Sequence, residues 1–485
     1  MIDTASVVSR VPTGLWVGGT SVRAAHEATF PVEDPATGQT IAVVASAGAS
    51  DALTAMDDAH DAQAEWAAVS PRRRSTVLRS AWQIVCDRAE ELALLITAEM
   101  GKTVPESRAE VTYAAEFLRW YSEEAVRING RYTQAPGGAG RILVTKTAVG
   151  PCLAITPWNF PLAMVTRKIG PALAAGCTVI LKPAAETPLT ALAFAEILAQ
   201  AGLPPGVVSV LPTIDPEQVA GPLMQDPRLR KVTFTGSTAT GRILLAHAAG
   251  NILRTSMELG GNAPFIVCDD ADIDAAIEGA MAAKMRNAGE ACTAANRFIV
   301  AEPIREEFTA RLAARIAALR VGPGYETGVD VGALVSSRHR DKVAALVDGA
   351  LRSGARLRTG GHTLAGPGHY YQPTLLDNVA ADAAILREEI FGPVAVIIGF
   401  SSVEEALERA NNTEYGLAAY VYTRDLDRAW RISEALDFGM VGVNRGIISD
   451  AAAPFGGIKQ SGMGTEGGAE GIEEYLETKY VAFTR

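Results

Sequence analysis

Three side chains of this sequence offer what covalent chemistry at a carbonyl requires: a thiol, a carboxylate and an amide. Cys292 lies among small residues in AGEACT (288–293), where a large substrate or cofactor group can approach its sulfur. Glu258 ends an apolar run just before a glycine pair, and Asn159 follows another apolar run. A thiolate attacks carbonyl carbon, a carboxylate in an apolar cleft can act as a general base, and an amide can donate to an oxyanion. These residues therefore predict nucleophilic catalysis.

The surroundings of Cys292 distinguish it from the other four cysteines. Cys86 lies in a helical pattern, and Cys152, Cys177 and Cys268 lie in or beside apolar runs, where a free cysteine is usually an inert core residue. No CxxC pair indicates a zinc site or a redox dithiol. We therefore expect reduced thiols, with Cys292 as the single candidate nucleophile.

The elements that must position these side chains follow a repeating β-α pattern from Val149 onward. Repeated β-α-β units predict an open, mostly parallel sheet, in which ligand sites gather at the carboxyl ends of the strands. The predicted sites fall in successive units, mostly at strand ends. Apolar runs predict strands at 152–155, 178–181, 207–211, 231–235 and 256–259, and the intervening helices are predicted at 161–175, 188–201 and 237–249.

A second β-α series, a helical N-terminal region and two isolated strand-like segments complete the pattern. The segments at 129–146 and 475–484 fit neither series, and unpaired strands often find partners on another chain. We therefore expect a sheet that crosses between subunits. The second series comprises predicted strands at 263–267, 297–300, 394–400 and 439–443 with a helix at 305–319, and the N-terminal helical region spans 49–127.

Two glycine-containing motifs bear on nucleotide binding. TFTGSTATG (233–241) combines a strand, a glycine turn and a hydroxyl-rich helix start, which suits phosphate binding and also ordinary helix capping. GMGTEG (462–467) matches the spacing of a dinucleotide fingerprint, but no β-α-β unit follows it. Only the first motif is a candidate nucleotide contact.

Composition limits the classes of function. The 485 residues predict about three domains at roughly 150 residues each. Lys and Arg number 44 against 55 Asp and Glu, a net charge of −11, which disfavours a nucleic acid partner and means that an anionic substrate must be met by local arginines. Residues 1–20 lack a basic start with an apolar core, and no apolar stretch is long enough to span a bilayer. A cytoplasmic location without a membrane partner is therefore expected.

Six motifs in order resemble the NAD(P)-dependent aldehyde dehydrogenase superfamily. The resemblance extends over nearly the whole chain, from DPATG (34–38) to PFGGIKQSG (454–462). The six motifs are PWNFPL (157–162), LKP (181–183), FTGS (234–237), ELGGNAP (258–264), the Cys292 segment and EEIFGPV (388–394).

The resemblance implies an α/β fold with a Rossmann-type cofactor domain, a second α/β catalytic domain and a small β oligomerisation segment. The implied ranges are 1–126 with 147–258 for the cofactor domain, 259–460 for the catalytic domain, and 127–146 with 461–485 for the oligomerisation segment. A homodimer or homotetramer is the implied assembly, and no metal is implied.

The family pattern also implies a role for each catalytic residue. Cys292 would be the nucleophile, the Asn159 amide and the Cys292 backbone N–H would hold the oxyanion, and Glu258 would activate the water that hydrolyses a thioester. The implied cofactor contacts are Ile155, Thr156, Trp158, Lys182, Ala185, Gly236, Ser237, Glu389 and Phe391.

Arg167, Arg286 and Ser449 resemble the substrate-carboxylate contacts of the succinate-semialdehyde dehydrogenase subfamily. Guanidinium groups fork onto carboxylates, which is what a short semialdehyde with a terminal carboxylate needs. The implied reaction is oxidation of succinate semialdehyde to succinate. Glutarate semialdehyde is the alternative substrate, and a cofactor-free cysteine esterase using Cys292 and Glu258 is a competing hypothesis from another class.

Three positions depart from the family pattern. Ala185 stands where NAD-specific members usually carry a ribose-binding glutamate, which leaves room for a 2′-phosphate and favours NADP over NAD. Glu290 replaces a common glutamine two residues before the nucleophile, and its charge would raise the pKa of the thiol. Ala294 replaces a second cysteine found in many relatives, which predicts that no disulfide switch forms at the site.

Overall fold

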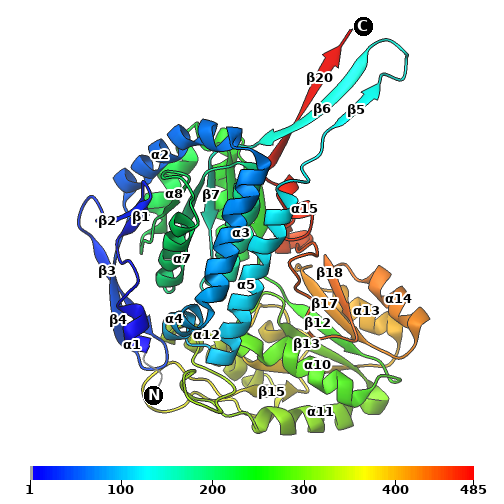
Figure 1. Cartoon of the computed structure of the whole chain (residues 1–485). Helices are drawn as coiled ribbons and strands as arrows, with labels where there is room; N and C mark the ends of the chain where they lie inside the picture. The colour runs from blue at the N-terminus through cyan, green and yellow to red at the C-terminus, as the bar shows by residue number, and fades with distance from the viewer. Residues whose placement is uncertain (1–3, 485) are drawn as a thin grey trace.

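The computed structural model describes residues 4–484 and shows two α/β bodies with a three-stranded sheet projecting from one of them (Figure 1). The predicted N-terminal helical region is confirmed as four consecutive helices that cover the first body. These are α2 (Ala49–Ala68), α3 (Pro71–Asp87), α4 (Ala89–Met100) and α5 (Val104–Glu124), and they follow α1 (Thr4–Val8), β1 (Leu15–Val17), β2 (Thr20–Val22), β3 (Thr29–Asp34) and β4 (Gln39–Ala45).

The first body is built on an eight-stranded sheet in the order β19-β11-β10-β7-β8-β9-β1-β2. Its five central strands are parallel, whereas β1, β2 and β19 (Gly462–Met463) are antiparallel additions. The central strands are β7 (Cys152–Ile155), β8 (Val179–Lys182), β9 (Val208–Val210), β10 (Lys231–Thr235) and β11 (Arg254–Glu258), and the connecting helices are α6 (Ala163–Ala175), α7 (Pro188–Gln200), α8 (Pro216–Gln225), α9 (Thr238–Ala248) and the 3-10 turn η1 (Ala249–Asn251). The strands and helices predicted here are confirmed, with small shifts at their ends.

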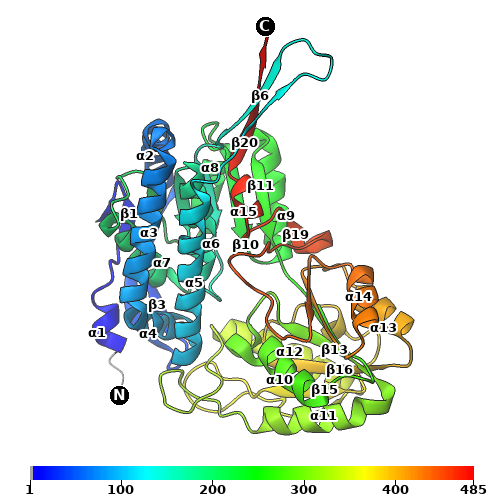
Figure 2. The same cartoon turned by 45° about the vertical axis from the view of Figure 1, so that its right-hand side comes forward.

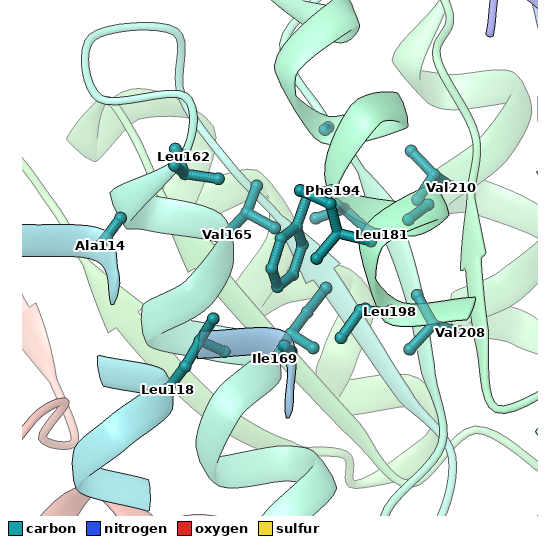
Figure 3. Close-up of a cluster of buried hydrophobic side chains, with 14 of the residues drawn as sticks. Ala114, Leu118, Leu162, Val165, Ile169, Leu181, Phe194, Leu198, Val208 and Val210 are labelled. Carbon is teal, nitrogen blue, oxygen red and sulfur yellow. The ribbon is translucent and has the colours of Figure 1, made fainter. Parts of the chain in front are cut away.

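Both faces of this sheet are buried, because successive residues of each strand point to opposite sides. In β7, Cys152 and Ala154 belong to one apolar cluster, whereas Leu153 and Ile155 belong to another. Figure 3 shows part of the first cluster, where Phe194 of α7 lies between side chains of α6 and those of the strands. This packing fixes the strand ends on which the site is built.

The second body holds a seven-stranded sheet in the order β14-β15-β16-β13-β12-β17-β18, parallel except for β14. Figure 2 shows it as a separate layer beneath the first body. Its strands are β12 (Ala263–Val267), β13 (Ala295–Ala301), β14 (Arg356–Thr359), β15 (Thr374–Asp377), β16 (Val394–Phe400), β17 (Ala418–Tyr422) and β18 (Met440–Val443). Its helices are α10 (Ile273–Met285), η2 (Arg286–Gly289), α11 (Glu302–Ala317), α12 (Ser337–Arg352), η3 (Ala384–Leu386), α13 (Val403–Asn411) and α14 (Leu426–Ala435).

After β18 the chain returns to the first body and then enters the projecting sheet. The 3-10 turn η4 (Lys459–Ser461) leads into β19, which pairs with β11, so the first two residues of the glycine-rich 462–467 segment form an edge strand of the sheet. Beyond α15 (Glu470–Glu473), β20 (Leu476–Phe483) pairs with β6 (Arg141–Ala148), and β6 pairs with β5 (Arg131–Gln134). The domain boundaries proposed from the sequence stay a prediction, because sheet membership does not define a folding unit.

Within residues 4–484, none of the helices combines the length and the apolar character that a bilayer crossing requires.

Candidate active site

The site lies where the strand order of the first sheet changes direction. From β7 the chain adds β8 and β9 on one side and then β10 and β11 on the other, so loops after β7 and β10 diverge and leave a crevice at their carboxyl ends. A cavity of about 190 Å³ lies there, between the two bodies. Seven predicted residues line it: Trp158, Asn159, Gly236, Ser237, Cys292, Glu389 and Phe391.

Cys292 is held at this cavity by an unusual backbone turn. Asn287 and Ala288 have φ values of 57° and 52°, in the left-handed region that most side chains avoid. The turn fits tightly, because a Cβ on Gly289 would stand 2.2 Å from the carbonyl oxygen of Gly392. Burial raises the pKa of the Cys292 thiol to about 12, Arg167 opposes that rise, and Glu258 adds to it. The resting thiol is therefore protonated at neutral pH.

Asn159 is fixed by partners that leave its amide directed at the cysteine loop. Its Nδ2 donates to the carbonyl oxygen of Glu290 at 3.0 Å, which leaves a second N–H on the same nitrogen. Its own backbone carbonyl accepts from Lys102 Nζ at 2.7 Å and from Asn287 Nδ2 at 3.0 Å. The sequence analysis missed Lys102 and Asn287, which act through the backbone and carry no recognisable motif.

Glu258 ends β11 with a buried carboxyl group that has no hydrogen-bond partner on either oxygen. It is 2% exposed, and burial together with the charge of Glu466 raises its pKa well above its usual range. A carboxylate made more basic in this way is suited to accept a proton.

A buried ion network lies beside Glu258. The carboxylate of Glu466 accepts from Arg167 Nε and from Lys168 Nζ, both at 2.5 Å, and all three side chains are at most 4% exposed. Lys168 also donates to Thr233 of β10 at 3.0 Å. Arg167 is therefore already ion-paired within the protein. Its buried Nη2 makes no hydrogen bond with any residue in 4–484.

The hydroxyl group of Tyr113, which the sequence analysis did not identify, has three neighbours. These are Arg167, Arg286 and Ser449. Burial raises the pKa of Tyr113, while Arg167, Arg286 and the Ser449 hydroxyl lie close enough to act in the opposite direction. Among residues 4–484, no atom lies in hydrogen-bond geometry with the Tyr113 hydroxyl. Arg167 and Arg286 also lower the pKa of Cys292, so the cationic group and the thiol share one neighbourhood.

The expected cofactor residues lie along β7, β8, β10 and the loop before β16. Ser237 caps α9 by accepting from the Thr240 N–H at 3.3 Å, so the capping role is seen directly. Lys182 is 8% exposed at the end of β8, and burial lowers its pKa while Glu186 opposes that shift. Glu389 accepts from the Gly261 N–H at 3.0 Å, and burial raises its pKa to about 7. Ile155 and Thr156 lie at the end of β7, outside the catalytic cavity.

Two residues of α12 reach the cavity and were missed by the sequence analysis. His339 Nε2 lies 2.6 Å from the carbonyl oxygen of Phe391 and must donate to it, and the His339 ring contacts Trp158 edge-on at 5.2 Å. Lys342 Nζ donates to the Glu389 carbonyl at 3.3 Å. Both side chains hold the segment that carries Glu389 and Phe391.

Glu290 does not have the effect expected of it. Its carboxyl group faces away from the thiol, accepting from the Val335 N–H at 3.1 Å and lying 3.6 Å from His339. Burial raises the pKa of Glu290 well above its usual range, whereas the hydrogen bond from Val335 and the charge of Lys102 oppose that rise. The raised pKa of Cys292 comes from burial, Glu258 and Glu389 instead.

Ala185 lies at a different cavity of about 240 Å³, together with Glu33, Glu99 and Glu186. Space beside Ala185 is therefore present, but it is lined by carboxyl groups. All five cysteines are free thiols, and Ala294 is buried near Cys292 with no second sulfur beside it in the sequence.

The comparisons with known proteins agree over most of the chain. A sequence profile described as "Aldehyde dehydrogenase family" matches residues 22–481. A succinate-semialdehyde dehydrogenase of Paenarthrobacter nicotinovorans is 56% identical over 441 residues, which cover 91% of this chain and 98% of that protein. A crystal structure of succinate-semialdehyde dehydrogenase from Burkholderia pseudomallei has a TM-score of 0.97 and 45% identity, covering 98% of this chain and 99% of that chain. An NADP-dependent enzyme of E. coli has a TM-score of 0.97 and 43% identity, covering 98% of both chains.

The raised pKa of the half-buried Cys292 thiol generates a first prediction. Alkylation of Cys292 by iodoacetamide should accelerate about tenfold per pH unit between about pH 7 and about pH 9, because a pKa of about 12 keeps the thiolate fraction rising throughout that range. Mass spectrometry of the peptide that contains Cys292 gives the rate, and a Cys292→Ala variant identifies labelling at other cysteines. A rate that levels off below pH 9 would contradict the environment described here.

Proposed function

The chain belongs to the aldehyde dehydrogenase family, and we propose that it oxidises succinate semialdehyde to succinate with NAD or NADP. The observation that carries this proposal is the meeting of Arg167, Arg286 and Ser449 around Tyr113, beside the Cys292 thiol. A cationic pocket next to a nucleophile suits an aldehyde whose far end is a carboxylate.

Cys292 is the proposed nucleophile. Its sulfur attacks the aldehyde carbon, and the S–C bond forms as the carbonyl π electrons move to oxygen. We propose that the second N–H of Asn159 Nδ2 and the backbone N–H of Cys292 donate to that oxygen. Because Lys102 and Asn287 fix the Asn159 backbone, the amide needs no reorganisation when charge develops.

Glu258 is the proposed general base. When bound at this cavity, a nicotinamide cofactor would supply the hydride acceptor that oxidation of the aldehyde requires. Glu258 then removes a proton from water, whose oxygen attacks the thioester carbon, and the acid product leaves as the sulfur recovers its proton. The raised pKa of Glu258 makes its carboxylate more basic than a solvated one.

The residues around the cavity fit a dinucleotide cofactor. Glu389 is half-buried with a second carboxylate oxygen available, and a Cβ on Gly260 would stand 2.6 Å from that oxygen, so glycine is needed there. We propose Glu389 and Lys182 for the two riboses, Ser237 for the pyrophosphate with Trp158 beside it, and Phe391 as a further cofactor contact. His339 and Lys342 support Glu389 and Phe391 through the backbone.

The site is expected to discriminate between substrates of different length less strongly than between charged and uncharged substrates. One methylene is worth about 1–3 kcal/mol in a pocket, so glutarate semialdehyde remains the alternative substrate. The esterase hypothesis is disfavoured, because the family match extends over the cofactor-side motifs as well as the thiol.

Ala185 supports use of NADP beside NAD. The missing carboxylate at this position leaves space for a 2′-phosphate, and Lys182 precedes Ala185 by three residues in the sequence. Glu33, Glu99 and Glu186 line the same cavity and oppose the added charge. We therefore propose that both cofactors are accepted, with NADP favoured only slightly.

The projecting sheet supports a homodimer or homotetramer. β5 and β20 are exposed edge strands, and Tyr132 and Tyr480 on them are 65% and 62% exposed. Edge strands with unpaired backbone groups are templates for pairing with another copy of the chain. The cytoplasmic location expected from the sequence stays a prediction.

The proposed base predicts a change of rate-limiting step. Glu258→Gln should slow thioester hydrolysis more than hydride transfer, producing a pre-steady-state burst of reduced cofactor absorbance. Hydrolysis in the starting enzyme should rise with pH, because a carboxyl group with a raised pKa becomes a base only as it ionises, and this dependence should vanish in the variant. Glu434→Gln, a change at an exposed carboxylate, should alter neither step. Equal slowing of both steps would remove Glu258 from this role.

The carboxylate pocket predicts a substrate-selective loss. Arg286→Ala should lower kcat/KM for succinate semialdehyde by about ten- to a hundredfold, as expected for about 1.5–3 kcal/mol from one charged contact. Activity on butanal should change by less than about twofold, and Arg286→Lys should restore part of the loss. Arg167→Ala is a poorer test, because it also leaves Glu466 with one cation fewer. Equal losses on both aldehydes would make Arg286 structural.

The cofactor proposal predicts a shift in preference. Ala185→Glu should move the ratio of kcat/KM values toward NAD by about tenfold or more, because a carboxylate beside the ribose repels a 2′-phosphate. Steady-state kinetics with both cofactors measure the ratio, with Ala185→Gln as the uncharged control of similar size. A starting enzyme that already prefers NAD by more than about tenfold, roughly 1.4 kcal/mol, would show that other residues set the preference.

A further inference from the structure

A larger cavity, of about 830 Å³, lies in the second body away from the catalytic residues. It shares no lining residue with the catalytic cavity. Its walls come from β13, β16, the end of α13 and the loop before Glu389, elements that Figure 2 shows in the lower layer. Three arginines line it, Arg297, Arg387 and Arg409, beside the amides of Asn411 and Asn412.

Arg297 is a buried charge without a counter-charge. It is 3% exposed, and its guanidinium donates to the carbonyl oxygens of Asn262, Arg409 and Ala410 through four hydrogen bonds. A guanidinium has five N–H groups, so one is left over. Burial lowers the pKa of Arg297 to about 10, and no carboxylate opposes that shift. A desolvated cation of this kind is costly unless an anion approaches it.

The other charges at the cavity do not neutralise this excess. Arg409 is paired with Glu405 at 2.6 Å, and Glu414 is paired with Arg242 at 3.6 Å. Arg387 is exposed and makes no ion pair or side-chain hydrogen bond with any residue in 4–484. Two positive charges, on Arg297 and Arg387, are therefore left uncompensated in a chain whose net charge is −11.

We propose that this cavity binds a small organic dianion, a phosphate monoester or a dicarboxylate, between Arg297 and Arg387. Two guanidinium groups match two negative charges, and arginine forks suit both phosphate and carboxylate oxygens. The amides of Asn411 and Asn412 and the apolar side chains of Leu386 and Ile398 supply walls for an uncharged body. The volume is that of an ordinary metabolite site.

Two variants test the site without disturbing Arg297, whose carbonyl contacts support the fold. Arg387→Ala removes one of the free charges, and Ala381→Glu places a carboxylate on the exposed wall of the cavity without removing an arginine. Arg431→Ala is the matched control, because Arg431 is an exposed arginine of α14 outside the cavity. Isothermal titration with inorganic phosphate, and separately with succinate in an Arg286→Ala background, is carried out with the cofactor site saturated by NAD.

The proposal expects one dianion bound per chain, at least about tenfold weaker binding in both cavity variants, and binding within about twofold of the original in Arg431→Ala. Phosphate binding alone would identify the phosphate class, and succinate binding alone the dicarboxylate class. The proposal is overturned if neither probe binds or if either cavity variant binds like the original protein. It is also overturned if Arg387→Ala changes the number of subunits in light scattering, which would make this face an interface between copies.

Discussion

The bond on which the rest of the site depends is the buried pairing of Glu466 with Arg167 and Lys168. Glu466 comes from the segment that returns to the first body after the second sheet, whereas both cations lie on α6. Removing one partner of such a buried group typically costs about 3–5 kcal/mol, because it leaves a charge without compensation. The pairing therefore fastens the C-terminal segment to α6. Next to burial, which has the larger effect, Glu466 raises the pKa of Glu258, Arg167 and Lys168 lower it, and Arg167 also lowers the pKa of Cys292.

The elements and the reacting groups were predictable from the sequence because their signals are local. In the sequence, strands β7, β8, β10 and β11 are short apolar runs. The site residues predicted from the sequence stand at the ends of these runs or directly after them. Tyr113 could not be predicted in the same way, since a tyrosine in an amphipathic helix has an ordinary packing explanation. His339 and Lys342 act on backbone carbonyls 47 or more residues away, which leaves no pattern in their own segment.

Glu290 shows why residue type alone does not give the electrostatics. A carboxylate two residues from a thiol suggests repulsion, but the left-handed turn at Asn287 and Ala288 directs the backbone so that the Glu290 side chain faces Val335 and His339. Arg167 is the opposite case, because its resemblance to a substrate contact concealed the ion pair it makes within the protein. For both residues, the electrostatic effect depends on the direction of the side chain, which the sequence does not show.

The tight turn around Cys292 has a consequence for how this enzyme can diverge. A Cβ on Gly261 would stand 2.5 Å from the Cys292 carbonyl, and one on Gly289 would collide with Gly392, so the reacting end tolerates almost no change of shape. The residues proposed to recognise the far end of the substrate lie at different places in the chain: Tyr113 is on α5, Ser449 follows β18, and Arg286 directly precedes the turn at the start of η2. Substitution of these side chains can therefore change which group at the far end of the substrate is bound, while the backbone around Cys292 stays the same. New substrates can then be accepted after a few substitutions.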